Sequence, residues 1–254
     1  MPLVVHNIPA FNDNYIWLFH QQGKSAAIVV DPGDASPVNE ALEELGLQLN
    51  AIIVTHHHSD HVGGIDQLVR QFSVPVYGPE GISQVTHVAN DGDKLELAET
   101  TFEVLAVPGH TLDHLAYYCN EPLVFCGDTL FVAGCGRLFE GTAEQMWHSL
   151  SKLAALPRDT KVFCAHEYTQ ANLTFALAVD PDNQYLQEKI DQVALQRSQF
   201  EATVPSTIAG ELSTNPFLRT NHKAIKLASE QYCGHPVTSQ AEVFSIIRKW
   251  KDNF

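Results

Sequence analysis

Basic residues are scarce in this chain. Of its 254 residues, 15 are lysine or arginine and 30 are aspartate or glutamate, which gives a formal net charge of −15. A protein of this charge repels other polyanions, so neither nucleic acid nor an anionic membrane surface is expected as a partner. The excess negative charge falls in the first two thirds of the chain. An anion-binding surface is therefore expected to draw its cations from the last third.

Long apolar segments are also missing. No stretch approaches the roughly 18 apolar residues that a membrane span requires. Residues 1–15, MPLVVHNIPAFNDNY, contain neither the basic start nor the sustained apolar run of a secretion signal. We therefore expect a soluble, cytoplasmic protein, and we expect it to be a monomer.

Cysteine offers no framework for the fold. The five cysteines are odd in number, and no two of them have the CxxC spacing. This pattern argues against a disulfide scaffold and against a structural zinc knuckle, and it fits a reducing cytosol. We expect these cysteines to be small buried side chains.

Short β-branched or apolar segments alternate with turns over the first two thirds of the chain. They predict strands at Tyr15–His20, Ala26–Asp31, Ala51–Thr55, Thr101–Val107, His114–Cys119, Leu123–Asp128 and Lys161–His166. Periodicity predicts helices at Pro37–Leu45, Val62–Phe72 and Thr142–Leu156, the last with the Thr142 and Gln145 spacing of a capping box. Many strands with few helices between them indicate two sheets packed face to face, with helices outside.

The last third of the sequence has a helical pattern. Helices are predicted at Glu167–Val179, Gln184–Phe200, about Asn221–Gln231 and Gln240–Lys251. The last of these opens with a second capping-box spacing, Ser239 with Glu242. No repeat or low-complexity linker interrupts the chain. We therefore expect a metal-binding catalytic domain at residues 1–167 and a docked helical, substrate-binding domain at residues 168–254.

Histidine is concentrated in one segment, THHHSDHVGG, which follows the apolar run AIIV at residues 51–54. Side chains at strand ends can converge on one point when a rigid sheet holds the loops that carry them. Four predicted strands end on, or run directly into, residues of metal-binding types: His56, His58, Asp60 and His61 at one, then His110, Asp128 and His166 at the others.

The spacing within the histidine segment indicates two metal positions. His56 and His58 are two apart in an extended segment, so they point the same way and can share one ion. Asp60 and His61 would begin the following helix and turn toward a second position. His57 points away from its neighbours, and His114 is expected to support the site rather than to bind metal.

The donor types narrow the choice of metal and of chemistry. Imidazole and carboxylate suit zinc, with iron or manganese as alternatives. Two such ions about 3.5–4 Å apart can share a hydroxide whose pKa is lowered toward about 7, which makes a strong nucleophile at neutral pH.

The pattern T-H-x-H-x-D-H at residues 55–61 resembles the signature of the metallo-β-lactamase superfamily. Gly109-His110-Thr111, Gly127-Asp128-Thr129 and His166 match the rest of that family's pattern in the same order. The resemblance implies an α/β fold: a four-layer αββα metallo-β-lactamase sandwich with the metal site at one edge, here followed by an all-helical C-terminal domain.

A narrower resemblance covers essentially the whole chain. The segments PAFNDNY, DPGDA, CGDTLFVAGCGRLFEGT and CAHEYT, with the basic C-terminus, are similar to those of the hydroxyacylglutathione hydrolases, also called glyoxalase II enzymes. This resemblance implies a thioester hydrolase. Its substrate would be S-D-lactoylglutathione or a related S-2-hydroxyacylglutathione, split to D-lactate and glutathione by a metal-bridging hydroxide in the second step of methylglyoxal degradation.

The resemblance also implies a role for each ligand. His56, His58 and His110 would hold the first ion, His61, His166 and Asp60 the second, and Asp128 would bridge them. Asp60 would in addition orient the hydroxide.

Four further residues match the family's glutathione contacts: Arg137, Tyr168, Arg248 and Lys251. Glutathione carries two carboxylates, and an acidic chain needs locally placed cations to hold them. Arg248 and Lys251 are three apart on the last helix and share a face. A solvated basic helix end that complements the helix dipole is the alternative interpretation.

Two positions depart from the family pattern. Phe139 stands where some relatives have tyrosine, and Asp113 replaces the glycine of Gly-His-Thr-x-Gly-His. We expect Asp113 to alter a turn near the site rather than to remove a ligand.

Other functions remain open from the sequence. They are a single-iron persulfide dioxygenase acting on a glutathione derivative, another hydrolase of the superfamily such as a lactonase or nuclease, and a non-catalytic metal-binding module. No dedicated general acid is evident, and this favours a thioester because a thiolate, whose conjugate thiol has a pKa of about 8.5, leaves without prior protonation.

Overall fold

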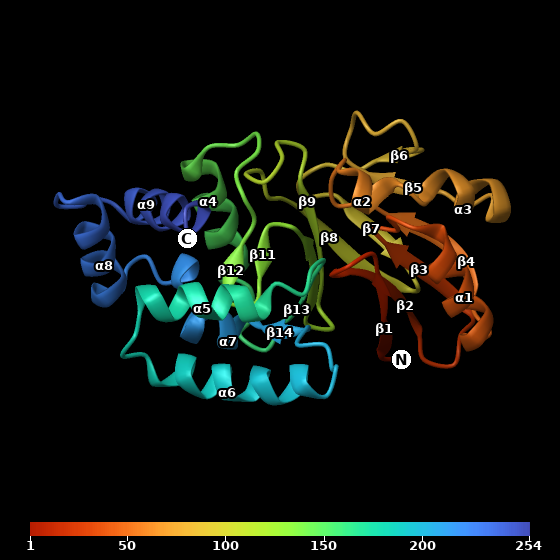
Figure 1. The fold of residues 1–254 in the computed structure, drawn as a ribbon. Helices are drawn as coiled ribbons and strands as arrows, with labels where there is room; N and C mark the ends of the chain where they lie inside the picture. Colours follow the sequence, from red (N-terminus) through yellow and green to blue (C-terminus); the bar gives the residue numbers. More distant parts are fainter. The chain divides into compact units, whose positions relative to one another are not determined.

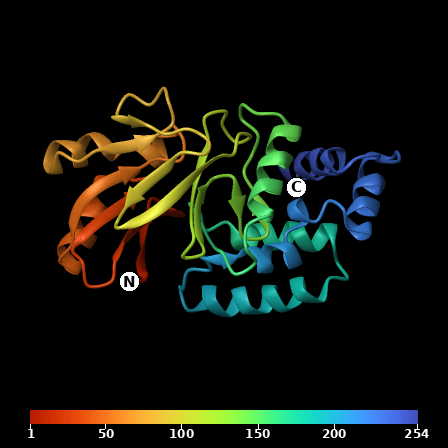
Figure 2. The same ribbon diagram turned by 180° about the vertical axis from the view of Figure 1, so that it is seen from behind.

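The computed structural model describes residues 1–254, and Figures 1 and 2 show the ribbon from two sides. The chain divides into two compact units. Unit 1 consists of Met1–Ala106 with Asp113–Gly127, and unit 2 consists of Val107–Leu112 with Asp128–Phe254. No helix of the structure is both long enough and apolar enough to cross a bilayer.

A mixed sheet forms the first layer of unit 1. Its strands, in order, are β1 (Leu3–Ala10), β2 (Asn14–Gln21), β3 (Ala26–Val30), β4 (Gln48–Ile53), β5 (Val76–Gly78) and β6 (His87–Val88). β1, β2 and β3 pair antiparallel, whereas β3 to β6 pair in parallel. Parallel strands require crossovers. The first is α1 (Ala35–Leu45), and α2 (Ser59–Val62) with α3 (Ile65–Phe72) makes the second.

The two faces of this sheet pack against different layers. Side chains alternate along a strand, and on β2 Leu18 packs in one apolar cluster with Val38 of α1 and Leu68 of α3. Phe19 lies on the opposite face and contacts Phe102 and Phe125, each with ring centroids 5.2 Å apart. Helices therefore cover the outer face of the sheet, and aromatic rings fill its inner face.

Phe102 and Phe125 belong to the second sheet of unit 1. It is antiparallel, in the order β7 (Lys94–Leu97), β8 (Thr100–Ala106), β9 (Leu115–Cys119) and β10 (Leu123–Gly127). The prediction of two sheets packed face to face is confirmed in this unit, and helices cover the outer face of the first sheet.

Unit 2 is mostly helical. Its strands are the hairpin β11 (Leu130–Phe131) with β12 (Gly134–Cys135), and β13 (Lys161–Cys164) with β14 (Ser206–Thr207). Its helices are α4 (Ala143–Ala154), α5 (Thr169–Val179), α6 (Gln184–Ser198), α7 (Ile208–Thr214), the 3₁₀ turn Pro216–Leu218, α8 (Lys223–Cys233) and α9 (Gln240–Asp252). α4 packs against α9, and α5 packs against α6. The predicted helical C-terminal region is confirmed.

Buried polar side chains hold the β11–β12 hairpin. Glu211 accepts a hydrogen bond from the backbone N–H of Ala133 at 2.8 Å, and burial raises the pKa of its carboxyl. Asn215 donates to the carbonyl of Gly134 at 2.9 Å. The hairpin comes directly after Asp128-Thr129, so these contacts fix the chain next to a predicted metal ligand.

Several local expectations can be compared with the structure. The capping box of α4 is confirmed, since Thr142 and Gln145 exchange both bonds. At α9, Ser239 caps the helix as expected, but the Glu242 carboxylate accepts from the backbone N–H of Thr238 instead. The prediction of one continuous helix over residues 62–72 was wrong, because Gly63 and Gly64 separate α2 from α3. Four cysteines are buried and Cys233 is partly exposed, with all five free.

Candidate metal centre and substrate-binding residues

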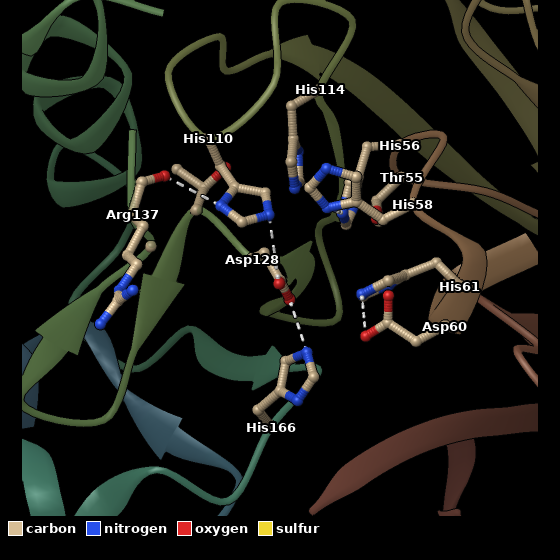
Figure 3. A network of polar contacts seen from close by, with 12 residues as sticks. Thr55, His56, His58, Asp60, His61, His110, His114, Asp128, Arg137 and His166 are labelled. Carbon is tan, nitrogen blue, oxygen red and sulfur yellow. Dashed lines mark hydrogen bonds and ion pairs between the residues drawn. The ribbon is translucent and has the colours of Figure 1, made fainter. Parts of the chain in front are cut away.

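Unit 1 supplies four of the predicted ligands from the end of β4 and the start of α2. His56 and His61 are almost fully buried, while Asp60 keeps 39% of its side chain exposed. His56 Nε2 lies 3.1 Å from His58 Nδ1, and His61 Nε2 lies 3.5 Å from Asp60 Oδ2 (Figure 3). Each contact brings a ring nitrogen against another potential metal donor.

The buried carboxylate of Asp31 decides which ring nitrogen of His56 and of His61 carries the proton. A carboxylate only accepts, so His61 Nδ1, 3.0 Å from Asp31 Oδ2, must carry the proton. The Thr55 hydroxyl donates to the same oxygen at 2.7 Å, and His56 Nδ1, 3.0 Å from that hydroxyl, therefore donates to Thr55. Both imidazoles consequently carry the proton on Nδ1 and the lone pair on Nε2, the arrangement expected of metal-binding histidines.

Asp60 is held by a neighbour from β2. Asn14 donates to Asp60 Oδ2 at 3.0 Å. A His61 ring protonated on both nitrogens, followed by this hydrogen bond from Asn14, lowers the pKa of Asp60 despite its partial burial. The carboxylate is therefore anionic at neutral pH and suited to a cation.

Unit 2 supplies the other three predicted ligands. Asp128 lies between two imidazoles: its Oδ2 is 3.4 Å from His110 Nε2, and its Oδ1 is 3.3 Å from His166 Nε2 (Figure 3). His110 Nδ1 donates to the carbonyl of Arg137 at 2.9 Å, so the lone pair of the neutral ring lies on Nε2. The ring of Tyr168 stacks on that of His166, with centroids 4.7 Å apart and planes within 5°.

The donor chemistry of both sets fits a divalent metal. Where Nδ1 is already the donor, Nε2 presents a lone pair to a carboxylate oxygen, and this contact is attractive only with a proton or a cation between the two atoms. A divalent ion that replaces the proton satisfies both donors. Imidazole nitrogen with carboxylate oxygen is the ligand combination of zinc, iron and manganese sites. The histidine and aspartate clusters of the fold thus indicate divalent-metal binding.

All four predicted glutathione contacts lie in unit 2, in different settings. Arg137 is 65% exposed, with Nε 3.7 Å from Asp252. Arg248 is buried, and it donates to the carbonyl of Cys135 at 2.8 Å and to Asp252 at 3.1 Å. Tyr168 is 38% exposed, and Lys251 is partly buried. A binding role for these residues stays a prediction.

The two departures from the family pattern are placed as follows. Asp113 Oδ2 lies 3.0 Å from Nδ1 of His57, so the histidine that the sequence assigned away from the metal has its own carboxylate partner. Phe139 is 63% exposed and its ring meets that of His110 edge-on at 5.2 Å. His114 is fully buried, and its ring stacks on His56 at 4.6 Å.

Sequence reasoning did not find the residues that support the ligands. Asp31 and Asn14 lie in the segments DPGDA and PAFNDNY, which were noted only as points of resemblance. The available signal was a carboxylate at the end of a buried strand. The same signal marks a residue that binds a metal and a residue that orients a metal ligand, so the sequence alone does not distinguish the two.

Comparison with known proteins places the fold and the ligand pattern in one class. The family model described as "Metallo-beta-lactamase superfamily" matches residues 11–86 and 78–166. A solved structure, ETHE1 from Myxococcus xanthus, superposes with a TM-score of 0.68, covering 97% of this chain and 91% of its own. At 24% identity this likeness concerns the fold alone.

Closer relatives narrow the class. A model described as "Hydroxyacylglutathione hydrolase C-terminus" matches residues 167–254. A protein of Aliivibrio salmonicida named hydroxyacylglutathione hydrolase is 54% identical to this chain, and the match covers 99% of this chain and 100% of the relative. A protein of Pseudomonas aeruginosa with the same name is 50% identical, and the match covers 97% of this chain and 98% of the relative. The chain therefore belongs to the hydroxyacylglutathione hydrolase family, within the metallo-β-lactamase superfamily.

Proposed function

We propose that this protein hydrolyses the thioester S-D-lactoylglutathione, and related S-2-hydroxyacylglutathiones, to a 2-hydroxy acid and glutathione. The observation that carries the proposal is the 54% identity, over 99% of this chain, with a relative named hydroxyacylglutathione hydrolase. The geometry within each unit supports the metal binding that this reaction requires, because the imidazole tautomers put the proton on Nδ1 and the lone pair on Nε2.

The metal centre of this proposal follows the family pattern. His56, His58 and His110 would hold one ion, Asp60, His61 and His166 would hold a second, and Asp128 would contribute to both. Zinc is the first candidate, and iron or manganese would suit the same donors. Two divalent ions, when bound, lower the pKa of water between them and polarise the thioester carbonyl.

The chain's own side chains prepare this chemistry. Asp31 and the carbonyl of Arg137 keep the protons of His61 and His110 on Nδ1. Asp60, anchored by Asn14, accepts a hydrogen bond from the attacking water and so orients it. The departing thiolate needs no proton donor, since its conjugate thiol is fairly acidic.

The substrate is held in this proposal by Arg137, Tyr168, Arg248 and Lys251. Arg137 and Lys251 offer their charges to the glutathione carboxylates, and Tyr168 offers its hydroxyl. Arg248 already donates to backbone carbonyls of the β12 segment, so its part is to fix that segment and to add positive charge. A catalytic domain at residues 1–167 and a glutathione-binding domain at residues 168–254, in a monomeric cytoplasmic protein, complete the proposal.

The proposal is tested by following the loss of thioester absorbance, with and without oxygen, on protein of known metal content. We expect hydrolysis that does not depend on oxygen. A silent thioester assay, together with oxygen uptake on glutathione persulfide, would overturn the proposal in favour of a dioxygenase. His58→Asn and His57→Asn form a matched pair, and only the first should abolish hydrolysis, because His57 pairs with Asp113 instead.

A further inference from the structure

The ammonium of Lys251 sits in a setting that opposes its charge. Nζ is largely removed from water, and the two buried rings of Phe175 and Phe217, with centroids 5.8 Å and 5.9 Å away, attract the cation only weakly in its place. Burial and, next, the guanidinium of Arg248 lower the pKa of Lys251 to about 8. The charge on this side chain at neutral pH therefore depends on the groups that stabilise it.

The charged and titratable neighbours of Lys251 come from three segments. Arg248 and Asp252 lie on α9 itself, Cys135 lies on β12, and Arg137 follows that strand. The two arginines lower the pKa of Lys251, while Asp252 and Cys135 raise it. From α5, the amide of Asn172 meets the amine directly: Lys251 Nζ donates to Asn172 Oδ1.

The orientation of the Asn172 amide is fixed by a second bond. Asn172 is only 3% exposed, and its Nδ2 donates to the carbonyl of Val132 at 2.9 Å. A flipped amide would set an oxygen against the Val132 carbonyl and an NH₂ group against the Lys251 ammonium. Both contacts would be repulsive, so Oδ1 always faces Lys251.

The hairpin leaves room for this amide because residue 134 is glycine. A Cβ at Gly134 would lie 2.5 Å from Asn172 Cγ, too close for any other residue. One side chain thus ties the β11–β12 hairpin to Lys251, and Arg248 ties the same hairpin to α9 through the carbonyl of Cys135. The flexible lysine side chain is ordered before any ligand arrives, which reduces the entropy lost on binding.

We propose that Asn172 is a positioning residue for substrate binding, which holds the Lys251 ammonium charged and directed for a carboxylate of the glutathione moiety. This inference rests on the proposed function, because it takes Lys251 to be a glutathione contact.

A double-mutant cycle tests the proposal. Asn172→Ala, Lys251→Met and the double variant are compared for the KM of S-D-lactoylglutathione and for the Kd of glutathione measured by calorimetry. We expect Asn172→Ala to raise both constants by about tenfold or more, as for a lost hydrogen bond to a charged group, with kcat nearly unchanged. In the Lys251→Met background the same substitution should add almost nothing, because it acts through Lys251.

The control and the pH profile separate positioning from structure. Thr174→Ala removes an exposed hydroxyl bond to the Gln170 carbonyl on the same helix, and it should change neither constant. The KM of the wild type should rise as pH increases above about 8, when Lys251 loses its proton. Asn172→Ala removes an acceptor from the charged form and moves this rise to lower pH, whereas Asn172→Asp adds a negative charge and moves it to higher pH.

Specific outcomes would overturn the inference. These are an equal rise in KM from Asn172→Ala in both backgrounds, a fall in kcat with KM unchanged, or pH profiles that coincide for the wild type and Asn172→Asp. If Asn172→Ala does not fold, as judged by circular dichroism, the Asn172→Asp profile decides alone. Failure of the proposed function is distinct, since the wild type itself would then leave the thioester intact.

Discussion

Substitution of Asp31 by asparagine should disable the ligand set of unit 1 without touching a ligand. Asp31 is 3% exposed and accepts three hydrogen bonds: Thr55 N at 2.7 Å, Thr55 Oγ1 at 2.7 Å and His61 Nδ1 at 3.0 Å. Asparagine keeps one oxygen to accept from the backbone N–H of Thr55, and it turns an NH₂ group toward Thr55 Oγ1 and His61 Nδ1. His61 must then accept at Nδ1 and carry its proton on Nε2, where a metal should bind.

The expected magnitudes follow from these bonds. A hydrogen bond to a charged group contributes about 1.5–3 kcal/mol, and two of the three are lost. Because the new NH₂ recovers part of this, the free energy of unfolding of the metal-free protein should fall by on the order of 3 kcal/mol. Loss of a residue that orients a metal ligand typically weakens metal binding by about tenfold to a hundredfold.

Two measurements check the prediction for Asp31→Asn. Urea unfolding of the metal-free protein gives the stability change, and competition with a chromophoric chelator gives the metal affinity. Asp34→Asn is the matched control in the same DPGDA segment, because Asp34 caps α1 through Ser36 N at 2.9 Å and asparagine caps equally well. Wild-type metal affinity and wild-type stability in Asp31→Asn would refute the assignment of the tautomers.

Two further substitutions probe the packing around the ligands. Gly136→Ala should yield folded protein with reduced metal content, because a Cβ at residue 136 would lie 2.0 Å from the carbonyl oxygen of Asp128 and would displace this predicted ligand. Full metal occupancy in this variant would contradict the close approach of residue 136 to Asp128. Tyr117→Phe should lower the free energy of unfolding by about 1–3 kcal/mol in urea titrations, since it strands the Val54 carbonyl. Tyr117 is fully buried, and its hydroxyl donates to that carbonyl at 2.6 Å. Burial also raises the pKa of its phenol. Unchanged stability of the variant would contradict a stabilising role for this hydrogen bond.

The sequence predicted the strands that carry the ligands because their apolar runs are short and are bounded by turns. It missed β1, whose sequence LVVHNIPA contains Pro9 and does not alternate strictly. It also joined α2 and α3 across Gly63 and Gly64, although a glycine pair in a helical pattern weakens the prediction of helix. In both cases a single residue or pair breaks the pattern locally, and a pattern read over a window of many residues does not detect such a break.

The supporting residues depend on contacts between distant positions. Asn172 appears in the sequence as an ordinary helical residue, yet it bonds Val132 and Lys251, which are 40 and 79 positions away. The shared face of Arg248 and Lys251 followed from their spacing, but the burial of Arg248 against the β12 segment did not. Spacing along one helix says nothing about what packs against that face.

The most direct test of the account is a titration of metal-free protein with zinc, in which bound metal and S-D-lactoylglutathione hydrolysis are followed on the same sample. The account predicts no hydrolysis without metal and a rise in rate that reaches its plateau at two ions per chain. Thioester hydrolysis by the metal-free protein, or two bound ions without any hydrolysis, would contradict it.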